Sequence, residues 1–144
     1  MLKIGIINGP NLNHLGKRDK NIYGSLTLSE INQKIKHVAE KENMELMFVQ
    51  SNSEGEIIDS IQKLSSQADG LIINPAAYTH YSYAIADALG DCPVPVIEVH
   101  LSNIFSREEF RQKSVTAPAC NGQIVGLGYH SYILALYGLL ALTK

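Results

Sequence analysis

The chain has 144 residues, 45% of them hydrophobic, and a formal net charge of −2 at pH 7. This length suits one domain, residues 1–144, with an ordinary packed core, and leaves little room for a second domain. The charge excludes a general attraction to nucleic acid or acidic membranes, and two cysteines without metal-type spacing favour a reducing compartment. No signal peptide is recognisable, and the apolar run 131–142 is shorter than the roughly 20 residues that cross a bilayer, so we expect a cytoplasmic protein.

Short apolar runs alternate along the chain with longer segments of helical periodicity. The predicted strands are Lys3–Asn8, Glu45–Gln50, Gly70–Asn74, Val94–His100 and Gln123–Gly126. The first predicted helix begins at a capping box at Thr27–Glu30, the second contains Ile57–Leu64, and the third runs from Thr79 to about Leu89. The fourth begins at a second capping box at Ser106–Glu109, and the last lies in the apolar tail. Such alternation predicts parallel pairing with right-handed crossovers. Five units in this length predict an α/β, flavodoxin-like, doubly wound domain with a five-stranded parallel sheet.

Polar side chains collect where the predicted strands end. Asn8–Asn11, Gln50–Asn52, Asn74–Ala76 and His100–Asn103 follow the first four strands. Because ligands bind beyond the carboxyl ends of the strands in such folds, these amides, hydroxyls and imidazole predict a site for an uncharged polyol ring. Each amide alone is also compatible with a simple turn.

Two further features point to the same edge. The segment 9–24 is long for a connection after a first strand, where about 2–6 residues are usual, so we expect a lid or binding loop rather than a plain surface loop. Glu98 and His100 lie two residues apart on a buried strand, so both side chains leave the same sheet face. The carboxylate can then fix the imidazole tautomer and favour its charged form; a histidine that is merely satisfied by hydrogen bonds is the alternative.

The following helices carry two more sets of candidate residues. Helical spacing places His80, Ala84 and Asp87 on one face of the third helix. Arg107 and Arg111 lie four apart in the next, short helix. Paired arginines can orient a carboxylate, or they can form a solvated surface pair beside the neighbouring glutamates.

An ordered series of motifs runs through the chain: Asn8–Asn13, Tyr23–Gly24, Gln50–Asn52, Glu54–Glu56, Asn74–His80, Glu98–Asn103 and Arg107–Arg111. These motifs resemble the type II 3-dehydroquinate dehydratases, and the resemblance extends from Lys3 to about Leu136. One departure is Lys20, where the family often has a proline, which affects the expected stiffness of the lid but removes no catalytic group.

The resemblance implies a lyase of the shikimate pathway that converts 3-dehydroquinate to 3-dehydroshikimate through an enolate, with no metal, cofactor or Schiff-base lysine. Tyr23 is then the base, activated by Arg18 with help from Arg107. A free tyrosine has a pKa of about 10, so such a base needs a cationic neighbour. Asn11 holds a water or hydrogen bond that stabilises the enolate. His100 is the general acid, oriented by Glu98.

The resemblance also implies the substrate contacts. The backbone N–H groups around Leu101 and Ser102 hold the substrate carboxylate. Asp87 reaches the site of a neighbouring subunit, which implies a trimer, usually assembled four times into a dodecamer. The remaining substrate-binding positions, which surround the ring hydroxyls, are Asn74, Ala76, His80 and Arg111.

Other functions of this fold fit less well. A phospho-acceptor domain needs acidic residues after the first and third strands, where this chain has Asn8 and Asn74. A flavin carrier needs a hydroxyl-rich phosphate loop, which Asn8–Asn13 lacks. A non-catalytic sugar-acid binding module stays as the alternative, although it has no reason to keep a tyrosine, an arginine and a histidine together.

Overall fold

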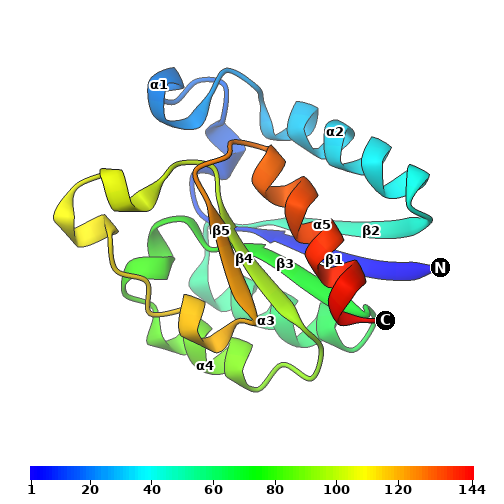
Figure 1. Ribbon diagram of the computed structural model, residues 1–144. Coiled ribbons are helices and arrows are strands. Elements are labelled where there is room, and N and C mark those ends of the chain that lie inside the picture. Colours follow the sequence, from blue (N-terminus) through cyan, green and yellow to red (C-terminus); the bar gives the residue numbers. More distant parts are fainter.

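The computed structural model describes residues 1–144, and its centre is a five-stranded sheet (Figure 1). The strands lie in the order β2-β1-β3-β4-β5, and every neighbouring pair is parallel. Their bounds are β1 Leu2–Asn8, β2 Met44–Gln50, β3 Gly70–Asn74, β4 Val96–His100 and β5 Gly122–Val125. The helices are α1 Lys20–Tyr23, α2 Leu28–Lys41, α3 Glu54–Ser65, α4 Tyr83–Gly90 and α5 His130–Leu142. This strand order is that of the flavodoxin-like doubly wound folds, so the predicted fold class is confirmed.

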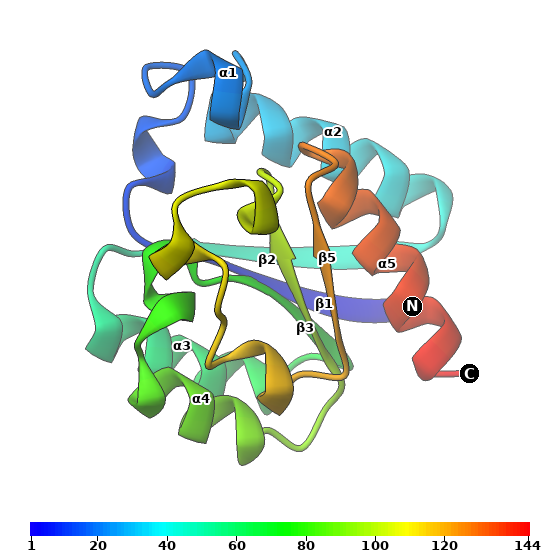
Figure 2. The same cartoon turned by 60° about the vertical axis from the view of Figure 1, so that its left-hand side comes forward.

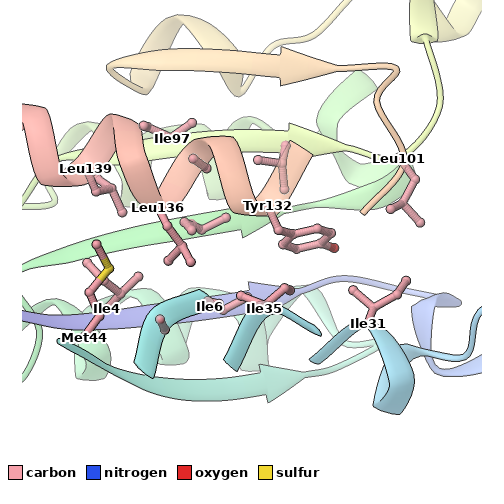
Figure 3. Packing of buried hydrophobic residues seen from close by; sticks show 14 of the residues in the cluster. Ile4, Ile6, Ile31, Ile35, Met44, Ile97, Leu101, Tyr132, Leu136 and Leu139 are labelled. Carbon is pink, nitrogen blue, oxygen red and sulfur yellow. The ribbon is translucent and has the colours of Figure 1, made fainter. Parts of the chain in front are cut away.

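Helices α2 and α5 cover one face of the sheet, and α3 and α4 cover the other (Figures 1 and 2). Successive strand residues point to opposite faces, so Ile6 packs in the cluster under α2 and α5 and Ile7 in the cluster under α3 and α4. Figure 3 shows Tyr132 and Leu136 of α5 against the sheet, with the Tyr132 hydroxyl directed toward the carboxyl ends of the strands. The apolar body of the sheet therefore leaves only this edge for polar side chains.

The first predicted capping box is present at the start of α2. The Thr27 hydroxyl accepts the Glu30 N–H at 3.1 Å, and the Glu30 carboxylate accepts the Thr27 N–H at 3.1 Å. This arrangement satisfies two of the N–H groups that every helix start leaves unpaired. It also fixes the point where the lid segment, residues 9–24, gives way to the regular scaffold.

The predicted start of the third helix at Thr79 is wrong. Helix α4 begins later, and Ser82 caps it by accepting the Ile85 N–H at 3.1 Å. Thr79 and His80 belong instead to a 3₁₀ turn, Ala76–His80. The Thr79 hydroxyl is fully buried against Glu98 and is not available as a cap. The predicted common face of His80 and Asp87 is therefore absent.

The second predicted capping box, at Ser106–Glu109, is also wrong. Two separate 3₁₀ turns, Ile104–Ser106 and Glu109–Arg111, replace the expected helix. The cap lies three residues earlier, where the Asn103 side chain accepts the Phe105 N–H at 3.1 Å. Strand β4 likewise begins at Val96, two residues later than predicted, because a proline at position 95 has no N–H for the ladder.

None of the helices is long and apolar enough to cross a membrane.

Candidate active site

A pocket lies beyond the carboxyl ends of β1, β3 and β4, between the lid segment and residues 100–111. In Figures 1 and 2 these two segments stand at the same edge of the sheet. The pocket brings together eleven of the predicted site residues: Asn11, Arg18, Tyr23, Asn74, Ala76, His80, His100, Leu101, Ser102, Arg107 and Arg111. The remaining lining residues, which the sequence analysis missed, are Pro10, Leu12, Ala77 and Ile104. Leu12 and Ile104 are buried. Each is an apolar residue in an otherwise polar loop, and this pattern in the sequence could have identified both.

Two arginines contact the phenol of Tyr23. Arg107 Nη1 donates a hydrogen bond to the Tyr23 hydroxyl at 2.9 Å. The Arg18 guanidinium lies over the face of the ring, 3.9 Å from its centroid. Arg107 therefore makes the direct contact with the oxygen, and Arg18 contacts the face of the ring. Two guanidinium groups thus lie against one phenol, one at its oxygen and one at its ring face.

Helix α1 carries Tyr23 on a single turn of four residues, Lys20–Tyr23. The Asp19 carboxylate caps this turn by accepting the Asn21 N–H at 3.0 Å. Tyr23 remains only half-buried. The phenol thus depends on contacts between two surface segments rather than on the core.

On the opposite side of the pocket, Glu98 and His100 form the expected pair. His100 Nε2 lies 2.8 Å from Glu98 Oε2, and both side chains are buried. The carboxylate accepts, so Nε2 carries a proton. His100 lines the pocket, and Nδ1 makes no hydrogen bond within the chain. The second ring nitrogen is therefore available to a bound ligand.

Hydroxyl groups surround Glu98 from below the pocket. Burial alone would raise the pKa of Glu98, but the hydrogen bond and charge of His100 and the hydroxyls of Thr116 and Thr79 outweigh burial and hold this pKa below its usual value. Glu98 has no exposed surface and does not line the pocket. It acts on the pocket only through the imidazole.

The side-chain amide of Asn74 has a fixed orientation. Its Oδ1 accepts the Ala76 N–H at 3.1 Å, and its Nδ2 donates to the Tyr132 hydroxyl at 3.0 Å. Tyr132 in turn donates to Asn8 Oδ1 at 2.5 Å. One N–H of Asn74 is left for the pocket. Burial raises the pKa of Tyr132, which therefore stays neutral as a donor.

Sequence reasoning missed Tyr132. A tyrosine in an otherwise apolar helix was the available signal, because a buried phenol needs a hydrogen-bond partner. Its partner Asn74 also holds Ala76, whose backbone has the left-handed φ of 51° that non-glycine residues rarely adopt. Such strained residues persist only where their surroundings hold them, commonly at functional sites.

His80 offers the opposite polarity to the pocket. Its Nδ1 lies 2.7 Å from the Lys113 carbonyl oxygen, which can only accept, so Nδ1 carries the proton. Burial lowers the pKa of His80, and the charges of His100 and Arg111 lower it further. The neutral ring therefore presents Nε2 to the pocket as an acceptor.

The amides at the end of β2 support the lid and do not line the pocket. Asn52 Oδ1 accepts the Asn11 N–H at 2.9 Å, and Gln50 Nε2 donates to the Gly9 carbonyl at 3.1 Å. Here the turn-forming alternative is correct. A side chain at Gly9 would meet the Pro75 carbonyl oxygen at 2.7 Å, so only glycine allows the lid to leave β1 this closely.

Asp87 and Arg111 differ from the other predicted site residues in their surroundings. Asp87 is exposed on α4 and does not line the pocket. Arg111 lines the pocket, but its Nε is paired with Glu108 at 2.5 Å. Nowhere does the chain gather three His, Cys, Asp or Glu side chains into a group that could hold a metal.

Residues 2–140 match the family model described as dehydroquinase class II. The chain is 59% identical over 140 residues to a 3-dehydroquinate dehydratase of Caldicellulosiruptor saccharolyticus, covering 96% of this chain and 97% of that protein. It is similar to the crystal structure of type II dehydroquinase from Butyrivibrio crossotus, with a TM-score of 0.94, 52% identity and coverage of 96% and 97% of the two chains. The type II dehydroquinase structure from Propionibacterium acnes also gives a TM-score of 0.94, at 39% identity and with 98% and 97% of the two chains covered.

Proposed function

The chain belongs to the class II dehydroquinase family, and from that premise we propose that it removes water from 3-dehydroquinate with Tyr23 as base and His100 as acid. The product of this elimination is 3-dehydroshikimate, an intermediate of the shikimate pathway. The observation that carries the two roles is the pocket itself. A phenol held by two cations faces it from one side, and an imidazole held by a carboxylate faces it from the other.

The first step removes the proton alpha to the ketone. Tyr23 takes this proton as a phenolate, which Arg107 stabilises through its 2.9 Å hydrogen bond and Arg18 through its place over the ring. The electron pair moves onto the ketone oxygen, which becomes an enolate. Asn11 lines the pocket and supplies a hydrogen bond, directly or through water, to that oxygen.

The second step expels the neighbouring hydroxyl. Hydroxide is a poor leaving group, so the breaking C–O bond must receive a proton. His100 Nδ1 supplies this proton, and Glu98 stabilises the imidazolium beforehand. The enolate collapses to a ketone as the new C=C bond forms, and one water leaves. The proton gained by Tyr23 returns to His100 through solvent.

Substrate orientation comes from groups of defined polarity. Asn74 offers a donor and His80 an acceptor to the ring hydroxyls. The backbone N–H groups around Leu101 and Ser102 receive the substrate carboxylate, and Arg111 contributes positive charge beside them. Ala76 lies in the same wall of the pocket.

The test is an ultraviolet assay of the purified chain with 3-dehydroquinate, run with and without a chelator. The product is a conjugated enone, so absorbance that the substrate lacks should appear at the same rate in both samples. Substrate binding without new absorbance would instead support the sugar-acid binding module. Activity lost in the chelator would overturn the metal-free mechanism.

We also propose that copies of the chain assemble as trimers that pack into a dodecamer, with Asp87 reaching a neighbour's pocket, and that this assembly works in the cytoplasm. The exposure of Asp87 and of the nearby apolar side chain of Tyr83, 70% exposed, supports a subunit contact on α4. Light scattering should give twelve times the chain mass of 15.8 kDa. A monomeric mass with full activity would overturn the shared site.

A further inference from the structure

Glu98 accepts more hydrogen bonds than its pairing with His100 requires. Besides His100, Glu98 Oε2 accepts from the Thr79 hydroxyl at 2.8 Å and from Gln123 Nε2 at 2.6 Å. The Thr116 hydroxyl donates to Glu98 Oε1. Four donors thus surround a carboxylate with no exposed surface.

We propose that Thr79, Ser114, Thr116 and Gln123, here called the carboxylate cage, are positioning residues that hold Glu98 as an anion and thereby keep His100 protonated as the acid. This inference rests on the proposed function for the step that His100 performs. The ionisation of Glu98 can be tested without turnover.

The donors around Glu98 Oε2 in the carboxylate cage favour an ionised carboxylate. Ser114 Oγ accepts the Ala117 N–H at 2.9 Å and donates to the Thr79 hydroxyl at 2.6 Å. The Thr79 proton then points to Glu98 Oε2. The amide nitrogen of Gln123 can only donate. A hydrogen on Oε2 would lie against one of these donors, so this oxygen carries none.

The carboxylate cage is assembled by tertiary structure and not by local sequence. Gln123 lies directly opposite Glu98 in the parallel register of β4 and β5, so both side chains leave the same face. Thr79 comes from the turn after β3, and Thr116 from the segment before β5. The Val115 N–H donates to the Thr79 carbonyl at 2.7 Å and fastens these two segments together.

His100 needs such a counter-charge because arginines line the same pocket. The guanidinium groups of Arg107 and Arg111 lie there, and their positive charge disfavours an imidazolium. Glu98 is the carboxylate in contact with His100. The titratable or charged groups that face this pair from other elements are Arg18, Tyr23, His80, Arg107, Arg111 and, behind Glu98, Cys120.

The primary experiment is an NMR titration of the Glu98 side-chain carboxyl in the ligand-free protein, with the signal assigned through its loss in Glu98→Gln. Thr116→Val and Gln123→Met each remove one donor while nearly keeping the shape. The titration midpoint of Glu98 should rise by about one pH unit in each variant, as expected for losing a hydrogen bond to a charged group. Thr116→Ser should restore the wild-type midpoint, because it keeps the hydroxyl.

Ser114→Ala removes the weakest member of the carboxylate cage, because Ser114 lies 3.3 Å from Glu98 and acts mainly through Thr79. Its midpoint shift should be the smallest of the series. In the absorbance assay, Thr116→Val and Gln123→Met should lose kcat at a higher pH than the wild type as the pH falls, because Glu98 is protonated earlier, while KM and kcat at neutral pH stay unchanged. A purely structural role would lower kcat at every pH.

An unchanged Glu98 midpoint in folded Thr116→Val and Gln123→Met would overturn the role of the carboxylate cage. If Thr116→Val fails to fold, Gln123→Met alone decides, because Gln123 is only partly buried on an edge strand. If the Glu98 midpoints rise as expected but the wild type does not dehydrate the substrate, the proposed function fails and the carboxylate cage stands.

Discussion

The two sides of the pocket hold their reactive groups in different ways. On the acid side, His100 and Glu98 are buried on a central strand, and the carboxylate accepts hydrogen bonds from several other elements. On the base side, Tyr23 is half-buried on a four-residue helix of the lid segment. It is held by Arg107, 84 residues away in the sequence, and by Arg18.

This difference indicates what sets the ionisation state of the acid and of the base. Hydrogen bonds in the interior are strong because the local dielectric is low, so the fold itself fixes the charge of Glu98. The base side lies nearer to water, where charges are screened and side chains are mobile. The acid should therefore be ready in the empty protein, whereas the base depends on the lid segment lying against the Arg107 segment.

The largest effect is expected from removing the base. Tyr23→Phe deletes only the hydroxyl, so folding and substrate binding should stay largely intact while kcat falls by about 10³-fold or more, at the upper range of acid–base contributions. Turnover by absorbance, binding by calorimetry and thermal unfolding measure the three properties. Activity near the wild-type level would show that another group takes the proton.

Removing the acid should divide the reaction into its two steps. In His100→Ala, water loss should slow by about 10²–10⁴-fold. Exchange of the alpha proton with D₂O, which needs only Tyr23, should slow much less. NMR of the substrate in D₂O follows exchange, and absorbance follows water loss. Equal slowing of both would remove His100 from the role of acid.

Removing either cation should weaken the base less than removing the phenol. Arg107→Gln loses a hydrogen bond to a charged group, worth about 1.5–3 kcal/mol, so kcat at neutral pH should fall about ten- to a hundredfold. Arg18→Gln should also lower kcat, because it removes the positive charge over the face of the Tyr23 ring. Unchanged kcat in both variants would separate these arginines from the base.

Tyr132 lies below the pocket, so Tyr132→Phe should lower the free energy of unfolding more than it lowers kcat. It leaves Asn8 and one N–H of Asn74 without a partner in the interior, which costs about 1–3 kcal/mol of unfolding free energy. KM should rise several-fold because the Asn74 amide can turn. Tyr137→Phe, on the same helix but with its hydroxyl on an exposed glutamate, is the control and should change stability by less than about 0.5 kcal/mol. Equal effects would argue against the buried network.

The smallest effect concerns acid stability. The pKa of Glu98 lies below 4.5, its value when unfolded, so its ionisation stabilises the fold fully above about pH 4.5, and this contribution is lost as the pH falls through the lowered pKa. Below pH 4.5 the wild type should therefore lose unfolding free energy more steeply than Glu98→Gln. Urea unfolding at several pH values measures both slopes. Parallel slopes would mean that the carboxylate is not held as an anion.

Some elements could be predicted because their signals are local. The alternation of apolar runs with helical periodicity predicted the parallel sheet, and the Thr27–Glu30 capping box predicted the start of α2. The same reasoning failed at Thr79 and at Ser106. Thr79 could cap a helix, but its hydroxyl instead donates to a buried carboxylate 19 residues away. The sequence around Thr79 does not show this distant partner, so it could not predict which of the two hydrogen bonds forms.

For the site, the sequence by itself determined which chemical groups stand at the strand ends, because parallel strands bring their carboxyl ends to one edge. Only the tertiary structure decided that Arg107, rather than Arg18, meets the phenol oxygen, that Tyr132 sets the orientation of Asn74, and that Gln123 joins Glu98. The physical reason is that a hydrogen bond depends on a separation of about 3 Å and on direction. Sequence spacing fixes these quantities within one element, but between elements they follow from packing.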